Sequence, residues 1–207
     1  MTHDYLRVSD DSDGNLNVIF NALRSPDVFV MSLAFVGTLI PVDAAQAFSA
    51  ALEVNTSLAT LTLINIELGD ADENVVLLAT SLRDNTSVEK LYIYNDRNFG
   101  DQNAIALSRI LLQGNGSAAL KYLELFNCGV GPDGAAVLGS ALRENKTLQG
   151  LYLAHNCRIG NTGAIALAQS LPHNKSLKRL CICDCGIGDE GAAELGQAFK
   201  TNKSLQE

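Results

Sequence analysis

The feature that most constrains the fold of this chain is a triplet, Asn-x-Ser/Thr, that recurs at a nearly constant spacing. Its six copies begin 30, 30, 30, 29 and 28 residues apart, at Asn55, Asn85, Asn115, Asn145, Asn174 and Asn202. A period of roughly 20 to 50 residues indicates a solenoid built by stacking one small unit. Such an array presents a broad surface of equivalent positions, so we expect function to lie on a surface and not in one enclosed pocket.

Five of the triplets open a stretch that reads Leu-x-x-Leu-x-Leu or a close variant. The alternation within Leu-x-Leu is the period-two signal of a short strand with one buried face. The five copies begin at Leu58, Val88, Leu120, Leu148 and Leu177. A looser copy, Val28-x-x-Met31-x-Leu33, stands thirty residues before the first of them.

Each predicted strand is followed by a glycine-containing turn and then by a stretch rich in Ala and Leu. Apolar residues at helical spacing predict helices over residues 134–142, 163–171 and 191–199. The Asn of each triplet falls just past a helix, where Asn tolerates the left-handed conformation that ends helices. The Ser or Thr two residues later can hydrogen-bond the turn backbone. Each unit is therefore predicted to be strand, turn, helix, turn.

Two segments carry a resemblance to a known family: Leu151-Tyr-Leu-Ala-His-Asn156 and Leu123-Glu-Leu-Phe-Asn-Cys128. The units resemble leucine-rich repeats of the ribonuclease-inhibitor type, which also occur in NOD-like receptor C-terminal arrays and in Ran GTPase-activating proteins. The resemblance covers roughly residues 28 to 207. It implies an α/β leucine-rich repeat solenoid, a horseshoe with a parallel sheet on the concave face and helices on the convex face.

The domain organisation follows from the repeats. Residues 1–13 are predicted to be a flexible acidic N-terminus, and residues 14–207 a single leucine-rich repeat domain. Within this domain residues 14–27 read as a degenerate helical cap, because residues 15–24 have an amphipathic pattern. About six repeats follow from residue 28. The last is expected to be incomplete, because the chain stops inside the next strand motif.

Composition argues against several classes of partner. A net charge of −8 and a pI of about 4.8 should repel nucleic acid and anionic membranes. The N-terminus lacks the apolar region of a secretory leader, and the chain holds no run of 18 apolar residues. Five cysteines, an odd number, suit a reducing compartment better than a disulfide framework. We therefore expect a cytoplasmic protein with no nucleic acid, membrane or small-molecule substrate.

Two glycine motifs match the dinucleotide fingerprint G-x-G-x-x-G, at residues 129–134 and 186–191. A Rossmann unit also needs an acidic residue about 20 residues further on, at the end of the next strand. The strand after the first motif ends Leu153-Ala154-His155, and the chain ends after the second. We interpret both as repeat turns and predict no cofactor. The Asn-x-Ser/Thr triplets also satisfy the N-glycosylation rule, but the helix-stop role accounts for them.

A cysteine cluster, Cys181-x-Cys183-x-Cys185, is the strongest hint of a metal site. Zinc could draw ligands from His155, Cys181, Cys183 and Asp184, yet the C-x₂-C spacing of zinc sites is missing. Cys185 occupies the position that holds Cys128 and Asn156 in other repeats, whose side chains are expected to satisfy loop backbone. We therefore interpret these cysteines as small apolar residues and predict no metal.

The strand template places the side chains that flank the core leucines on the exposed side of the sheet. Four of the five tyrosines fall in this set, together with Phe126, although only 6% of the chain is aromatic. Such rings either stack across strands or form a binding patch, and we favour the patch because exposed aromatic clusters mark interaction sites. The predicted partner-binding residues are Lys90, Tyr92, Tyr94, Tyr122, Glu124, Phe126, Tyr152, His155, Arg179 and Asp184.

The leading hypothesis for function is a non-catalytic protein-interaction scaffold, of a kind that a larger regulatory or sensor protein could contain. Its partner is expected to be a protein that binds the concave sheet face. The alternative is a GTPase activator that resembles the Ran-specific family, for which Asn95, Asn127 and Arg158 are the loose candidates. The sequence shows no nucleophile elbow, Walker A loop or metalloprotease helix, so we predict that the chain is not an enzyme.

Overall fold

The computed structural model describes residues 2–9, 16–67, 73–112 and 120–206, and in these ranges seven strands alternate with seven helices. The strands are β1 (Thr2–Ser9), β2 (Phe29–Val36), β3 (Thr60–Ile64), β4 (Lys90–Tyr94), β5 (Tyr122–Phe126), β6 (Gly150–Tyr152) and β7 (Arg179–Cys181). The helices are α1 (Leu16–Leu23), α2 (Val42–Val54), α3 (Glu73–Asp84), α4 (Gly100–Leu112), α5 (Pro132–Glu144), α6 (Gly160–Ser170) and α7 (Asp189–Thr201). The triplet at Asn115 lies outside the described residues.

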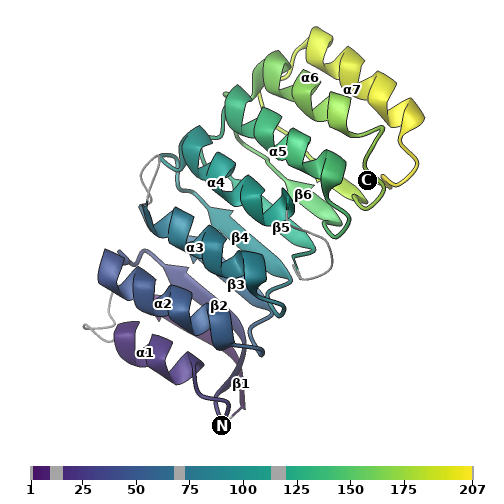
Figure 1. Ribbon diagram of the computed structural model, residues 1–207. Coiled ribbons are helices and arrows are strands. Elements are labelled where there is room, and N and C mark those ends of the chain that lie inside the picture. Colours follow the sequence, from purple (N-terminus) through teal and green to yellow (C-terminus); the bar gives the residue numbers. More distant parts are fainter. Residues whose placement is uncertain (1, 10–15, 68–72, 113–119, 207) are drawn as a thin grey trace.

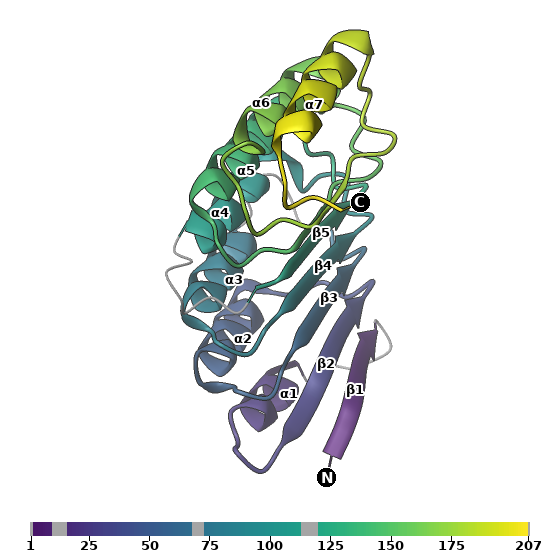
Figure 2. The same cartoon turned by 90° about the vertical axis from the view of Figure 1, so that its right-hand side faces the viewer.

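The strands form one parallel sheet in the order of the chain, from β1 at one end to β7 at the other. Each helix returns the chain to the start of the next strand, and consecutive helices pack against one another along the stack. Figure 2 shows the helices on one side of the sheet and no helix over the other side. The α/β solenoid predicted from the sequence is confirmed. We call the uncovered side of the sheet the open face.

The core lies between the sheet and the helices. Leu61, Leu91, Leu123 and Leu151 are neighbours in the strand register, and each is almost fully buried. The strands β3, β4 and β5 alternate between buried and half-buried positions. This alternation follows from the period of two in a strand, and it confirms the predicted strand motif.

The asparagine that ends each helix is a structural bridge between repeats. Asn174 Nδ2 donates to the Leu142 carbonyl at 2.6 Å and to the Asn145 carbonyl at 3.2 Å. Its Oδ1 accepts the backbone N–H groups of Ser176 and Leu177 at 3.0 and 2.7 Å. The same pattern recurs at the other described triplets, so we call this set the asparagine ladder: Asn55, Asn85, Asn145, Asn174 and Asn202.

The conformation predicted for these asparagines is wrong. Asn55, Asn145 and Asn202 are extended, with φ of −76°, −70° and −70°, and not left-handed. The extended backbone of each asparagine ends its own helix, and the amide side chain caps a carbonyl at the end of the helix one repeat earlier. No left-handed backbone is needed for either role. Since these amide nitrogens donate to carbonyls, they are not available to a glycan in the folded chain.

Left-handed residues occur instead at the other end of the repeat, just after each strand. After strands β2 to β7 the first left-handed residues are Gly37, Asn65, Asn95, Asn127, His155 and Asp184, and others follow in the same turns at Glu67, Gly100, Gly129, Gly160 and Gly186. Asn65 donates its backbone N–H to the Tyr94 carbonyl, and Asn95 donates to the Phe126 carbonyl, both at 2.9 Å. The turn thereby adds one more rung to the parallel ladder before the chain leaves the sheet.

The N-terminus departs from the prediction of a flexible segment over residues 1–13. Residues 2–9 form β1, which pairs with β2 so that Leu6 meets Leu33 and Val8 meets Phe35. Val8 is buried and Leu6 packs against the core. This Leu-x-Val alternation is a shortened strand motif, and the first unit is therefore a strand with its helix α1, not a helix alone.

The register of the first predicted repeat is also corrected. The strand motif there is Val30-x-x-Leu33-x-Phe35, two residues later than predicted, because Leu33 pairs with Leu61 and Phe35 with Leu63. Met31 is 44% exposed. Phe35 takes the second leucine position because its ring packs in the core, 5.8 Å from the ring of Phe20 and 5.6 Å from that of Phe48.

Candidate functional site

The open face carries three rows of side chains, two with one position from each of the seven strands and a third with positions from β1 to β5. The first row holds Tyr5, Ser32, Thr60, Lys90, Tyr122, Gly150 and Arg179. The second row holds Arg7, Ala34, Thr62, Tyr92, Glu124, Tyr152 and Cys181. The third row holds Ser9, Val36, Ile64, Tyr94 and Phe126. From β3 onward these are the positions predicted from the strand template.

The rings on β4 to β6 gather in one region of this face. We define the aromatic patch as Tyr92, Tyr94, Tyr122, Phe126 and Tyr152, all of them half-buried. The ring centroids of Tyr92 and Tyr94, and of Tyr94 and Phe126, lie 6.1 Å apart. Tilted rings at this separation attract one another, so each ring is held by its neighbours while part of its surface faces solvent.

A glycine in the first row makes room for two of the rings. A Cβ atom at Gly150 would lie 2.7 Å from Tyr122 Cδ1 and 2.8 Å from Tyr152 Cε2. Both rings therefore lean over the bare backbone of β6. A side chain at position 150 would have to displace them, so the glycine contributes to the shape of the aromatic patch.

Polar groups fix the orientation of the patch. Tyr94 Oη donates to Glu124 Oε2 at 2.9 Å, and Lys90 Nζ lies 5.8 Å from the centroid of the Tyr122 ring. Burial and the hydrogen bond to Glu124 raise the pKa of Tyr94 well above its ordinary value. Burial and the nearby charge of Glu124 also raise the pKa of Tyr92. Glu124 thus lies within the aromatic patch, in contact with its rings.

His155 and Asp184 border the patch at the ends of the last strands. The His155 ring lies 4.7 Å from the ring of Phe126, and its Nδ1 is 3.4 Å from Asp184 Oδ2. Both residues have left-handed backbones, so they occupy equivalent positions in consecutive repeats. Arg179 lies in the first row on β7, next to Gly150 in the register. All ten predicted residues thus lie on the open face or at its border.

The sequence missed two parts of this surface. Tyr5, 58% exposed, stands in the first row on β1, so all five tyrosines of the chain lie on the open face. The pattern Tyr5-Leu6-Arg7-Val8 could have revealed it. The second part is a polar hollow of about 950 Å³ at the carboxyl ends of the strands. Its lining is Val36, Ile64, Asn65, Glu67, Asn95, Asp96, Arg97, Asn98 and Asn127.

The residues considered for a GTPase activator lie in the turns after the strands and before α6. Asn127 Nδ2 donates to Asn95 Oδ1 at 3.1 Å, so these two amides bind one another. Arg158 is exposed in the loop that precedes α6. Among the described residues no feature favours GTPase activation over partner binding.

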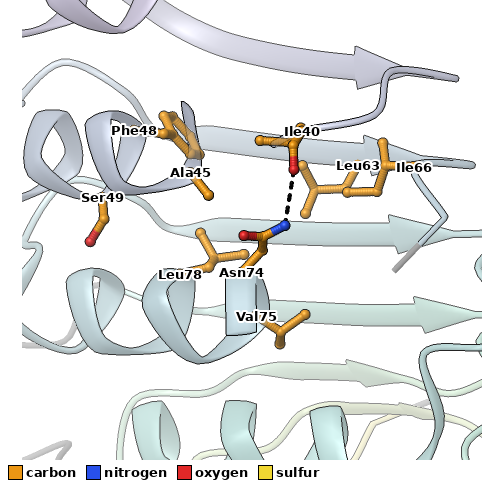
Figure 3. A pocket seen from close by; sticks show the side chains of 9 residues that line it. All are labelled: Ile40, Ala45, Phe48, Ser49, Leu63, Ile66, Asn74, Val75 and Leu78. Atoms are coloured by element: carbon orange, nitrogen blue, oxygen red, sulfur yellow. Dashed lines mark hydrogen bonds between the residues drawn. The ribbon is translucent and has the colours of Figure 1, made fainter. Parts of the chain in front are cut away.

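A small cavity lies on the other side of the sheet, between α2 and α3. Figure 3 shows its apolar lining, which includes Phe48, Leu63 and Leu78, and the hydrogen bond from Asn74 Nδ2 to the Ile40 carbonyl at 3.0 Å. Its volume of about 30 Å³ is close to that of one water molecule. Drug-sized ligands need roughly 300 Å³ or more, so this cavity is a packing gap and not a binding site.

In both glycine motifs, backbone N–H groups are already bound by a side chain of the preceding repeat. Asp101 Oδ1 accepts the backbone N–H groups of Gly131 and Gly134 at 2.6 and 2.9 Å. These are the groups that a phosphate would use at the start of α5. Asn161 Oδ1 accepts the equivalent N–H groups of Gly188 and Gly191 at the start of α7.

Glycine is required in these turns by close contacts. Gly129 has a φ of +67°, and a Cβ there would lie 2.1 Å from the Arg97 carbonyl oxygen. A Cβ at Gly134 would lie 2.6 Å from Asp101 Oδ1. The motif therefore serves the packing of one repeat on the next, which supports the interpretation as a repeat turn.

Four of the five cysteines fall into two groups. Cys128 and Cys185 are buried, and their thiols donate to the carbonyls of Ile93 at 3.3 Å and Leu153 at 3.0 Å. Asn156 at the equivalent position donates to the Leu125 carbonyl, so the predicted role of these positions in satisfying loop backbone is confirmed. Cys181 and Cys183 face the open side. Within the described ranges no three His, Cys, Asp or Glu side chains are grouped as metal ligands.

Comparison with known protein families identifies three of these strand and helix units. A family model described as Leucine Rich repeat matches residues 117–139, 144–168 and 173–196, and each match contains one strand and part of the following helix. Three units of the chain, within residues 117–196, are leucine-rich repeats. Units of 28 to 30 residues that each include a helix are consistent with the ribonuclease-inhibitor type. No curated protein sequence matches this leucine-rich repeat chain.

The chain is also similar to two solved structures. The tropomodulin C-terminal domain from Caenorhabditis elegans is 12% identical, with 91% of this chain and 93% of that one covered and a TM-score of 0.49. The structure titled Leiomodin-1 Actin-Binding Site 2 is 17% identical, with 92% and 88% covered and a TM-score of 0.44. No helix in the described part of the chain is long and apolar enough to span a membrane.

Proposed function

We propose that this leucine-rich repeat protein is a non-catalytic scaffold that binds a protein partner on the open face of its sheet. The observation that carries the proposal is the aromatic patch. Five half-buried rings from β4, β5 and β6 lie together on a face that no helix covers. Tyrosine is among the residues that contribute most to binding at protein interfaces, because it combines apolar area with a hydrogen-bonding hydroxyl.

The patch is suited to binding because it is already ordered. Tyr94 is held by Glu124, and the rings of Tyr122 and Tyr152 are placed over Gly150. Side chains that are fixed before binding lose little conformational entropy when a partner covers them. Covering their remaining apolar surface would contribute about 25 cal/mol per Å².

Charge points to a partner recognised by shape and apolar contact. The basic side chains of the three rows are Arg7, Lys90 and Arg179, and the acidic one is Glu124. With Asp184 at its border, the open face carries three basic and two acidic side chains, a formal charge of +1, although the chain carries a net charge of −8. We expect the affinity for the partner to depend only weakly on salt, because screening acts on net opposite charge between the two surfaces.

The competing interpretation is that the rings only stabilise the sheet. Cross-strand aromatic pairs contribute roughly 0.2–1 kcal/mol each. Both interpretations predict some loss of stability when the rings are removed. Only the binding interpretation predicts that partner capture is lost while the fold is retained.

The experiment compares three forms of the chain as bait in quantitative affinity purification. The first is the wild type, and the second carries Tyr92→Ala, Tyr122→Ala and Tyr152→Ala on the open face. The third is a matched control with Val54→Ala, Val76→Ala and Phe199→Ala, three exposed apolar residues of the helices.

We expect proteins captured by the wild type and the control to be absent from the open-face variant, with circular dichroism unchanged in all three. Equal capture by the open-face variant would refute the assignment of this face. A parallel GTP-hydrolysis assay with Ran-type GTPases tests the GTPase-activator alternative, for which we expect no acceleration.

A further inference from the structure

Two cysteines on the last strand differ from the rest in their surroundings. Cys181 ends β7 and Cys183 follows two residues later, and their Sγ atoms lie 2.8 Å apart. Cys181 is half-buried and Cys183 is exposed, so reagents in solution can reach the pair. Cys128 and Cys185, in contrast, are buried and bound to backbone carbonyls.

The separation of the two sulfur atoms discriminates between metal binding and oxidation. A disulfide bond is about 2.05 Å long. Two thiolates on a tetrahedral zinc ion, with Zn–S bonds of about 2.3 Å, would be roughly 3.8 Å apart. At 2.8 Å the thiols are already closer than zinc ligands would be, and less than 1 Å of movement separates them from bonding distance.

The backbone around the pair is anchored in the sheet. The Cys181 carbonyl accepts the N–H of Leu153 at 2.8 Å, and the Cys183 carbonyl accepts the N–H of His155 at 2.9 Å. These bonds hold residues 181 and 183 along one strand direction, so that both side chains point to the same face. The proximity of the thiols therefore follows from the strand geometry.

We propose that Cys181 and Cys183 are a reversible oxidation site that closes an intrachain disulfide by exchange with a low-molecular-weight disulfide such as glutathione disulfide. One thiol loses its proton and attacks the added disulfide, which releases one glutathione thiolate and leaves a mixed disulfide. The second cysteine, as thiolate, then displaces the other glutathione and forms the Cys181–Cys183 bond. The two cysteines lose two electrons and two protons, and the oxidant becomes two molecules of glutathione.

The test uses the full chain, fully reduced and then treated with glutathione disulfide. Thiols that remain are alkylated under denaturing conditions and counted by intact-protein and peptide mass spectrometry. The variants are Cys181→Ser and Cys183→Ser, and the control is Cys157→Ser, which removes an exposed cysteine outside the pair.

We expect Cys157→Ser to lose two thiols to the Cys181–Cys183 bond and to carry no glutathione. The wild type should lose a third thiol, because exposed Cys157 carries one glutathione; dithiothreitol should restore all of these thiols, with no change in oligomeric state. In the Cys157→Ser background, Cys181→Ser and Cys183→Ser should instead retain one glutathione on the remaining member of the pair. The proposal is overturned if Cys181 and Cys183 both stay as thiols, or if the disulfide within the chain involves Cys157 or Cys185. It is also overturned if the reduced wild type retains one equivalent of added Zn²⁺ that Cys181→Ser does not retain.

Discussion

Tyr94 Oη donates a 2.9 Å hydrogen bond to Glu124 Oε2, which ties the third row of β4 to the second row of β5. The hydroxyl of Tyr94 gives the Glu124 carboxylate a hydrogen-bond donor in a place where its other neighbours are mainly aromatic rings. The bond also orients Tyr94 between the rings of Tyr92 and Phe126. This pair therefore organises the aromatic patch before any partner arrives.

Replacing Glu124 with Gln should lower the pKa of Tyr94, since the carboxylate raises it through a hydrogen bond and through charge. The pKa should stay above the ordinary value, because burial is the largest cause of the shift and remains. Ultraviolet titration of tyrosinate, with Tyr94→Phe to assign the transition, measures the change. An unchanged pKa in Glu124→Gln would show that the bond is not formed in solution.

Replacing Asn174 with Ala should lower the free energy of unfolding by about 2–4 kcal/mol, because a buried carbonyl at Leu142 and a buried N–H at Leu177 lose their partner. Lys175→Ala, at the exposed neighbouring position, should change it by less than about 0.5 kcal/mol. Urea unfolding followed by circular dichroism provides both values. Equal stability of the two variants would contradict a structural role for the asparagine ladder.

Replacing Asp101 with Ala should destabilise the chain by about 1–2 kcal/mol, the usual cost of losing a helix N-terminal cap. The cap here is supplied by the preceding repeat, since Asp101 lies in the first turn of α4 and binds the start of α5. Asp101→Asn keeps the acceptor oxygen and should recover most of the loss. Asp133→Ala, in the exposed first turn of α5, is the matched control, and a loss as large in that variant would argue against the cap.

Much of this architecture could be predicted from the sequence because it depends on period alone. The spacing of Leu-x-Leu motifs fixes which residues face the core, and with them the rows that hold Tyr92, Tyr122 and Tyr152. The order of the strands also follows, since each unit can bury its apolar face only against its neighbours.

The parts that could not be predicted depend on contacts within the folded chain. The sequence predicts the first repeat two residues too early, because Val28, Met31 and Leu33 fit the strand motif as well as Val30, Leu33 and Phe35 do. Only the packing of Phe35 against Phe20 and Phe48 selects the register. The bond between Tyr94 and Glu124 likewise arises between repeats, at positions that no spacing rule connects.

The free energy of unfolding should fall at alkaline pH because of the buried thiol of Cys128. Burial raises the pKa of this thiol to about 12, whereas the unfolded chain ionises it near its ordinary value of about 8.5. The folded state holds the proton that the unfolded state loses, so this contribution to stability is complete below about pH 8.5 and declines as pH rises toward 12.

Cys128→Ser isolates this effect, because serine does not titrate and its hydroxyl can still donate to the Ile93 carbonyl. The unfolding free energy of the wild type should fall relative to that of the variant between about pH 8.5 and pH 10.5. Chemical unfolding at several pH values measures the difference. A constant difference across this range would mean that the thiol is not protected from ionisation.

The central claim is that the partner covers the aromatic patch, and ¹⁹F NMR of the chain labelled with fluorotyrosine tests it most directly. All five tyrosines lie on the open face, four of them in the patch and Tyr5 three strands away on β1. Single Tyr→Phe variants assign the five resonances. Tyr5 then serves as the reference within the same molecule.

When a partner identified by affinity purification is added, the resonances of Tyr92, Tyr94, Tyr122 and Tyr152 should shift or broaden more than that of Tyr5. Binding of the partner with these four resonances unchanged would contradict the account, because the contact would then lie on another surface of the array.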